Sequence, residues 1–307
     1  MNTSLREAAQ MVSELSHGNW NRTFPASGLE FKDFKTMVVK ESGNEYEMLP
    51  SARRLISTRL RLPADYLLRC PRELQAQNLN YWLQRLNETP LFCRFNERKV
   101  RAFFTPRYKP IDNIEIIAKV METFDPDLKV ELRLNNEMMV LNIPDYGRSF
   151  AVHGDPIMPG THLGNSEVGF ASYACSVFYV RIVCTNGLIA TDQIAVKLRH
   201  VKMHALDDFE STMREVKRLA LYQQEKIRIS IESKVDDPKA TIASFGKQFQ
   251  LTKDEVTIAQ AAWEHDPQYT LWNVIQAFTW AAKNEDLPAE VAYRFQRVGG
   301  QVLALAK

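Results

Sequence analysis

Residues 91–104, with the sequence LFCRFNERKVRAFF, decide the fold class because they read as a β-hairpin. Both halves carry the aromatic and β-branched side chains that strands favour, and Asn96-Glu97-Arg98 supplies turn residues between them. Alternation along each strand separates a buried face from a solvent face. The face expected in the core holds Leu91, Cys93, Phe95, Val100, Ala102 and Phe104. The face expected in solvent holds Phe92, Arg94, Lys99, Arg101 and Phe103.

This outward face and the segment after it combine positive charge with flat rings. Residues 94–113 contain six Lys or Arg and four aromatic residues, opposed only by Glu97 and Asp112. Cations can bind phosphates and rings can stack on bases, so the pattern predicts a nucleic-acid interface. The predicted interface comprises Arg94, Arg98, Lys99, Arg101, Phe103, Arg107, Tyr108 and Lys109. The alternative is a solvated hairpin whose cations keep a sheet edge from aggregating.

Two later segments extend the predicted interface. Tyr179 and Arg181 lie two apart in a β-prone run and would add a ring and a cation on one strand face. Lys197 and Arg199 belong to a basic segment further along the chain. The competing interpretation of Arg181 is an internal ion pair with Glu167.

The patterns around the hairpin predict an α+β fold. KVELRL at 129–134 and EMMVLNI at 137–143 read as two strands joined by an Asn-Asn turn. Helical periodicity dominates from residue 205 onward. We therefore predict an α+β body at 1–204, in which helices cover one face of a mostly antiparallel twisted sheet, and an all-helical region at 205–307.

Three local predictions accompany this division. The glycine- and proline-rich residues 144–168 are expected to form loops. Residues 205–233 are expected to form one long helix. A helix at about 71–87 is expected to gather its apolar side chains near one face. That face holds Leu74, Leu79, Trp82, Leu83 and Leu86.

Composition adds limits on partners and location. The 307 residues are 45% hydrophobic, which suits a packed globular chain. The net charge is +2, but residues 1–110 hold 18 Lys and Arg against 11 Asp and Glu, and the rest holds 21 against 26. An anionic partner is therefore expected on the N-terminal part. Four cysteines without a CxxC pair, no signal peptide and no membrane-length apolar run predict a reduced, cytoplasmic protein without membrane association.

Motifs for chemistry are weak. The chain has no phosphate-loop, GxSxG or HExxH pattern, so no catalytic residue, metal site or cofactor is predicted. His153, Asp155 and His162 lie in the Gly/Pro-rich segment and could do acid–base work or bind a cation together with Glu167. An enzyme thus stays open as an alternative.

Three blocks, VRAFFTPRYKPIDN, LGNSEVGF and RIVCTNGLI, carry a family resemblance. In this order and spacing they resemble the phage/plasmid-like proteins of domain-of-unknown-function family 932, over about residues 45–235, with the helical tail outside. The matching positions are Arg101, Ala102, Thr105, Arg107, Tyr108, Asp112, Asn113, Asn165, Ser166, Glu167, Gly169, Arg181, Cys184, Asn186 and Gly187. The resemblance implies that the protein is encoded on a mobile element, near genes for replication and recombination. It does not imply a specific activity.

The basic surface and the resemblance together favour binding of single-stranded DNA (or RNA). The specific expectation is strand annealing by a homo-oligomer, such as a ring, that needs no nucleotide cofactor. One alternative is a mobile-element protein that binds a host protein through its helical tail. The other is a metal-dependent enzyme acting on nucleic acid.

Overall fold

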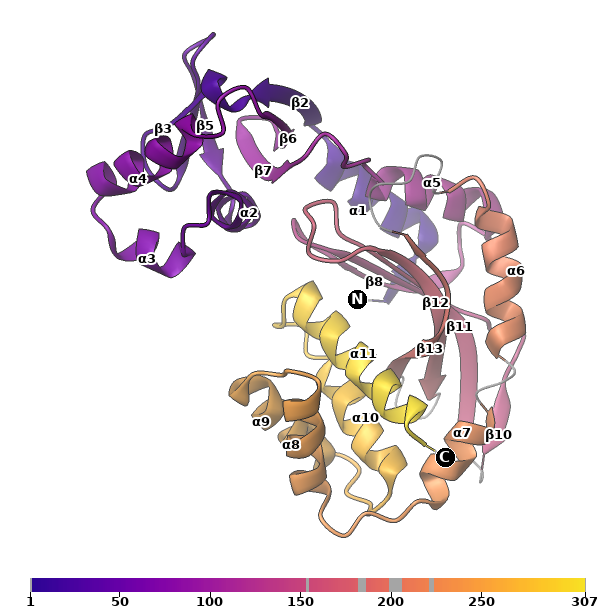
Figure 1. The fold of residues 1–307 in the computed structure, drawn as a ribbon. Helices are drawn as coiled ribbons and strands as arrows, with labels where there is room; N and C mark the ends of the chain where they lie inside the picture. Colours follow the sequence, from indigo (N-terminus) through magenta and orange to yellow (C-terminus); the bar gives the residue numbers. More distant parts are fainter. Residues whose placement is uncertain (1, 153–154, 182–185, 199–205, 221–223, 307) are drawn as a thin grey trace.

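The computed structural model describes residues 2–152, 155–181, 186–198, 206–220 and 224–306, with backbone alone at 2, 155 and 186–198. Two β-sheets, each with its own hydrophobic core, organise these residues (Figure 1). The predicted α+β class, with antiparallel sheets followed by helices, is confirmed, although two sheets stand where one was expected. None of the described helices has the length and apolar character needed to cross a membrane.

The smaller sheet belongs to a unit formed by residues 19–104, which we call the N-terminal unit. Its strands run in the order β2-β6-β7-β5-β4-β3, and all neighbours are antiparallel except β5 and β7. The strands are β2 (Asn19–Pro25), β3 (Leu29–Phe31), β4 (Thr36–Val39), β5 (Asn44–Met48), β6 (Pro90–Asn96) and β7 (Lys99–Phe104). The helices are α2 (Pro50–Leu60), α3 (Ala64–Arg69) and α4 (Arg72–Gln84), with a 3-10 turn at Ala26–Gly28.

Helix α4 does not bury the whole predicted face. Leu79 and Leu83 join the core of the N-terminal unit, and Leu86 packs against it. Leu74 and Trp82, which were expected beside them, are exposed. The inward face of α4 instead includes Gln75 together with Leu79 and Leu83. The Gln75 side chain forms hydrogen bonds with the backbones of Phe34 and Leu67.

The β6–β7 hairpin forms where the sequence predicts it, but a β-bulge changes its faces. The cross-strand pairs are Cys93 with Phe103, Arg94 with Ala102, and then Phe95 with Val100, which leaves Arg101 as the extra residue. One extra residue inverts the alternation beyond it. Phe103 therefore joins Cys93 in the core, and the prediction that Phe103 and Arg101 face solvent is wrong.

The larger sheet runs in the order β1-β8-β9-β11-β12-β13, with β10 paired to β11, and every pair is antiparallel. Its strands are β1 (Asn2–Ser4), β8 (Lys129–Leu134), β9 (Met139–Pro144), β10 (Phe150–Val152), β11 (Asp155–Asn165), β12 (Tyr173–Arg181) and β13 (Asn186–Leu198). Helices α1 (Leu5–Ser16) and α5 (Asn113–Thr123) begin with capping boxes at Ser4 and Asp112.

Helices cover both faces of this sheet. Figure 1 shows α6 on one side of β11–β13, with α10 and α11 on the other. The C-terminal helices are α6 (Phe209–Leu219), α7 (Gln224–Glu232), α8 (Pro238–Gln248), α9 (Lys253–Trp263), α10 (Leu271–Ala281) and α11 (Ala289–Ala304). Leu141 and Val177 of the sheet share one core with Phe278 of α10 and Phe295 of α11, so these helices are packed on the sheet.

Two local predictions differ from the structure. Residues 144–168, expected to be loops, contain the eleven-residue strand β11. Gly160 lies so close to β9 that a Cβ there would be 2.4 Å from the Ile143 carbonyl oxygen, so this glycine serves a strand contact instead of a turn. The single helix expected at 205–233 is two helices, α6 and α7, on either side of residues outside the described part.

Candidate nucleic-acid interface

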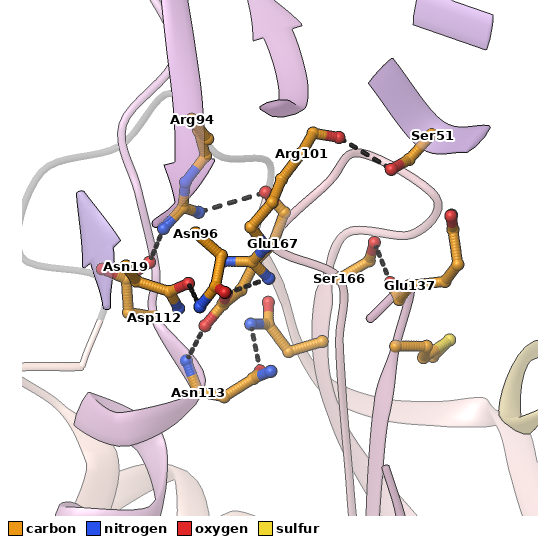
Figure 2. A network of polar contacts seen from close by, with 12 residues as sticks. Asn19, Ser51, Arg94, Asn96, Arg101, Asp112, Asn113, Glu137, Ser166 and Glu167 are labelled. Carbon is orange, nitrogen blue, oxygen red and sulfur yellow. Dashed lines mark hydrogen bonds and ion pairs between the residues drawn. The ribbon is translucent and has the colours of Figure 1, made fainter. Parts of the chain in front are cut away.

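Glu167 joins the two sheets through buried polar contacts. It lies in the β11–β12 connection, which reaches the N-terminal unit (Figure 2). Its Oε2 forms an ion pair with Arg101 Nη2 at 2.6 Å, and its Oε1 accepts a hydrogen bond of 2.7 Å from the backbone N–H of Asn113. Both charged side chains are almost fully buried, at 5% and 2% exposure. Two of the three sequence blocks thus meet in space.

Arg94 strengthens the same junction. Its side chain is 1% exposed, forms an ion pair with Asp112 and donates to the Glu167 carbonyl oxygen at 3.1 Å. The Tyr108 hydroxyl donates to that carbonyl oxygen at 3.1 Å, while the Tyr108 ring stacks on Phe104 with centroids 3.8 Å apart. Arg94 and Tyr108 are therefore committed to internal contacts.

The remaining residues of the second block hold the connection in shape. Asn165 Nδ2 donates to the Ile111 carbonyl at 2.9 Å and to Asn113 Oδ1 at 2.8 Å. Ser166 Oγ donates to the Glu137 carbonyl at 2.6 Å. Gly169 has a φ of +77°, and a Cβ there would be 2.9 Å from the Phe104 ring. Asn113, Asn165, Ser166, Glu167 and Gly169 thus form a structural junction, which we call the Glu167 junction together with Arg94 and Arg101.

Charge pairing in the Glu167 junction sets the ionisation of its groups. Burial alone would raise the pKa of the Glu167 carboxyl, but Arg101 and Arg94 hold it below its ordinary value. Burial would lower the pKa of the Arg94 guanidinium, but Asp112 and Glu167 raise it. Burial raises the pKa of Tyr108 to about 12. At neutral pH the junction therefore holds charged Arg94 and Glu167 and a neutral Tyr108.

The third block lies elsewhere. Arg181, at the far end of β12 from Glu167, forms an ion pair of 2.7 Å with Asp266, so the competing interpretation, an ion pair with Glu167, is wrong. Tyr179 is buried and donates its hydroxyl to the Ala220 carbonyl at 2.7 Å. Asn186, Gly187 and Lys197 belong to β13, where the backbone alone is described. Arg199 and Cys184 lie outside the described residues.

The structure divides the predicted interface into buried and exposed members. Five predicted contact residues are buried and cannot touch a ligand in this conformation: Arg94, Arg101, Phe103, Tyr108 and Tyr179. Four are exposed, and no carboxylate of the described residues lies within ion-pairing distance of them: Arg98, Lys99, Arg107 and Lys109. Alternation predicted a continuous basic sheet face, but Phe103 turns into the core at the bulge. Arg94, Arg101 and Tyr108 contact Glu167 of the β11–β12 connection instead of solvent.

The groups proposed for acid–base work are also enclosed. His162 is fully buried, and its Nδ1 lies 2.7 Å from Asn142 Oδ1. Asn142 uses its amide to donate to Glu131, so His162 Nδ1–H is the donor of this bond. Burial, together with Arg297, lowers the pKa of His162 to about 3. His153 lies outside the described residues, and the described residues form no cluster of three or more His, Cys, Asp or Glu able to hold a metal.

A buried neutral histidine predicts acid sensitivity. The unfolded chain takes up a proton at this residue below about pH 6.5, whereas the folded protein does not until about pH 3. Stability is therefore lost as pH falls, by up to about 1.4 kcal/mol per pH unit. We expect His162→Gln to flatten the slope of unfolding free energy between about pH 6.5 and 5, measured by urea titrations. His17→Gln, at an exposed position, is the control, and equal slopes for both variants would contradict the prediction.

A family model described as "Domain of unknown function (DUF932)" matches residues 102–298. The chain belongs to this family. No curated protein and no solved structure shows significant similarity to it. Membership of family 932 is confirmed, whereas the phage or plasmid context stays a prediction. The predicted extent is corrected, because the DUF932 match begins inside β7, includes α8–α10 and ends inside α11.

Outside the DUF932 match, the N-terminal unit carries cations that the sequence reasoning missed. Helices α2–α4 with their caps span residues 50–85, which hold seven arginines and only two acidic residues, Asp65 and Glu73. We call these seven the arginine surface: Arg53, Arg54, Arg59, Arg61, Arg69, Arg72 and Arg85. The local excess of arginine over acidic residues was the available signal for this surface. It lacks the strand alternation that predicts a basic face for the hairpin.

Proposed function

We propose that the protein binds single-stranded nucleic acid through the N-terminal unit. The observation that supports this is the arginine surface. All seven side chains are exposed or half-buried. Within the described residues, only Arg54, with Glu137 at 3.5 Å, and Arg72, with Asp33 at 3.8 Å, have a carboxylate in ion-pairing distance. The other five have no carboxylate partner among the described residues, so their charge is not neutralised by an ion pair there.

Unpaired arginines on adjoining helices suit a phosphate backbone. Helix α2 contacts both α3 and α4, so their cations belong to one region of the unit. Each phosphate that a cation neutralises releases a counterion, which makes binding fall steeply with salt. Exposed Arg107 and Lys109 in the loop after β7, and Arg98 and Lys99 at the β6–β7 turn, add to the positive charge of the unit.

The finer expectations belong to this same proposal. They are DNA as the natural ligand, strand annealing, an oligomeric ring, and a place on a phage or plasmid within a reducing cytoplasm. They stay predictions drawn from the resemblance and composition. The Glu167 junction and His162 give no support to the enzyme alternative, because Glu167 is held in an internal ion pair and His162 is fully buried, out of reach of a substrate.

Charge reversal tests the proposal directly. We expect Arg61→Glu/Arg69→Glu to weaken binding of a labelled 40-nucleotide strand at least about tenfold at 100 mM salt. It should also make the plot of log affinity against log salt shallower by about 1–2. The measurement is fluorescence anisotropy across a salt series.

The matched control changes the same net charge elsewhere. Lys247→Glu/Lys253→Glu reverses two exposed cations on α8 and α9, which lack an ion-pair partner among the described residues. We expect wild-type affinity for this variant. Equal weakening by both double variants, or no binding by the wild type at low salt, would refute the proposal.

A further inference from the structure

Exposed apolar side chains are concentrated on α3 and α4. Among the described residues nine large hydrophobic side chains are exposed, and five of them lie on these two helices. The five are Tyr66, Leu68, Leu74, Tyr81 and Trp82. Figure 1 shows α3 and α4 at the end of the N-terminal unit that points away from the larger sheet. Exposed apolar groups that gather in one place mark a binding surface more often than isolated ones do.

Helical spacing aligns these side chains into one stripe. Leu74, Asn78, Tyr81 and Arg85 recur at intervals of three and four along α4 and its C-cap, so they share a face. Tyr66 of α3 joins this face, because Asn78 Nδ2 donates to its hydroxyl at 3.3 Å. The stripe lies opposite the buried residues Leu79 and Leu83.

The rings of this stripe are held by an arginine. The Arg85 guanidinium lies 4.6 Å from the Tyr81 ring centroid and 4.9 Å from that of Trp82, and it also hydrogen-bonds the Tyr81 hydroxyl. Tyr81 and Trp82 meet edge to face, with centroids 5.4 Å apart and planes at 88°. Their exposures are 52% and 39%. Two rings at right angles offer separate faces, so each can take one base.

We infer that Tyr66, Tyr81, Trp82 and Arg85, which we call the aromatic cluster, stack on unpaired bases and give the protein its preference for single strands. This inference rests on the proposed function, since the arginine surface would supply the phosphate contacts. Bases of a single strand are free to stack on protein rings, whereas duplex bases are already stacked on one another. An excess of arginine over carboxylate around the rings favours a polyanion over an ordinary apolar protein partner.

The test separates rings from charge. We expect Tyr81→Leu/Trp82→Leu to weaken binding of a 40-nucleotide oligothymidine at least about tenfold, because two rings on which bases can stack are lost. Its salt dependence should stay as steep as that of the wild type, since no cation is removed. Duplex affinity should not change. Tyr81→Phe/Trp82→Phe keeps both rings and should retain most of the single-strand affinity.

Two controls complete the experiment. Tyr146→Leu/Tyr269→Leu removes two exposed rings outside the N-terminal unit and should bind as the wild type does. An abasic strand of equal length keeps the phosphates and lacks the bases, so the wild type should bind it about as weakly as the leucine variant binds oligothymidine.

The outcomes distinguish this inference from the proposed function. If the leucine variant binds oligothymidine like the wild type, or the wild type binds the abasic strand equally well, the inference fails while salt-steep binding stands. If the wild type binds neither strand at low salt, the proposed function fails and the inference fails with it. A wild type without strand preference whose dimerisation, seen by light scattering, is abolished by Tyr81→Glu would assign this face to contact between copies.

Discussion

Glu167→Gln is expected to lower the free energy of unfolding by about 3–5 kcal/mol. Breaking a buried ion pair by neutralising one partner costs this much, because the remaining charge stays in a low-dielectric site. Here the neutral amide would leave two buried arginines, Arg101 and Arg94, with Asp112 as the remaining carboxylate that contacts one of them. Denaturant titrations followed by circular dichroism measure the loss.

The control is an ion pair in solvent. Glu122→Gln removes the partner of Lys119 on the surface of α5, where salt and water already screen the pair, and its unfolding midpoint should match that of the wild type. If both variants unfold at the same denaturant concentration, the Glu167 junction does not hold the two sheets together in the way we describe.

The stabilisation by Glu167 also has a defined pH range. Its pKa in the folded protein is held below the ordinary value, so the unfolded chain binds the proton first as pH falls. The contribution is complete above about pH 5 and is lost as pH falls below about 4. The difference between wild type and Glu167→Gln should therefore narrow in acid.

Gly160→Ala is expected to lower the free energy of unfolding by about 3 kcal/mol. The new Cβ would lie 2.4 Å from the Ile143 carbonyl oxygen and 2.9 Å from the Pro144 Cα. Both are backbone atoms of a paired strand, so relief requires β9 and β11 to separate. Overpacking in a rigid core costs about 1–3 kcal/mol, and a backbone neighbour places this site at the upper end. Thermal or denaturant unfolding measures the change.

Gly147→Ala is the matched control for this substitution. Its Cβ would have Asp145 Oδ1 at 3.5 Å as its nearest neighbour, which is an ordinary contact. Stability within about 0.5 kcal/mol of the wild type is expected for a surface change of this kind. If both alanine variants lose similar amounts of unfolding free energy, β9 and β11 can separate at Gly160 at little cost, and the prediction is wrong.

Local patterns in the sequence predicted those parts of the fold that depend on neighbours along the chain. The β6–β7 hairpin and strand β8 lie where the sequence predicts them, and β9 begins two residues after its predicted start. These features depend on a few adjacent side chains. Strand β11 was not predicted because Gly160 is required by close contact with β9, and local composition does not show that β9 is its partner.

The candidate site was harder to predict because its contacts are distant in sequence. A single bulge residue, Arg101, inverted the faces of β7, and periodicity cannot show where a bulge occurs. Glu167 and Asp266, the carboxylates that pair with Arg101 and Arg181, lie 66 and 85 positions further along the chain. Buried and surface arginines look alike in a sequence when such partners are unknown.

The path of the chain has a consequence for biosynthesis. Helix α1 is translated before the N-terminal unit. Helix α5 and strand β8, which share its hydrophobic core, are translated only after that unit. All six strands of that unit are complete at Phe104, so we expect the unit to fold on the ribosome before α1 has its packing partners. During this interval Arg101 has no carboxylate, because its partner Glu167 lies 63 positions beyond the end of β7 and is not yet synthesised. The nascent unit therefore carries more net positive charge than the finished protein. A polyanion that is present during synthesis would bind the unit in this more basic form.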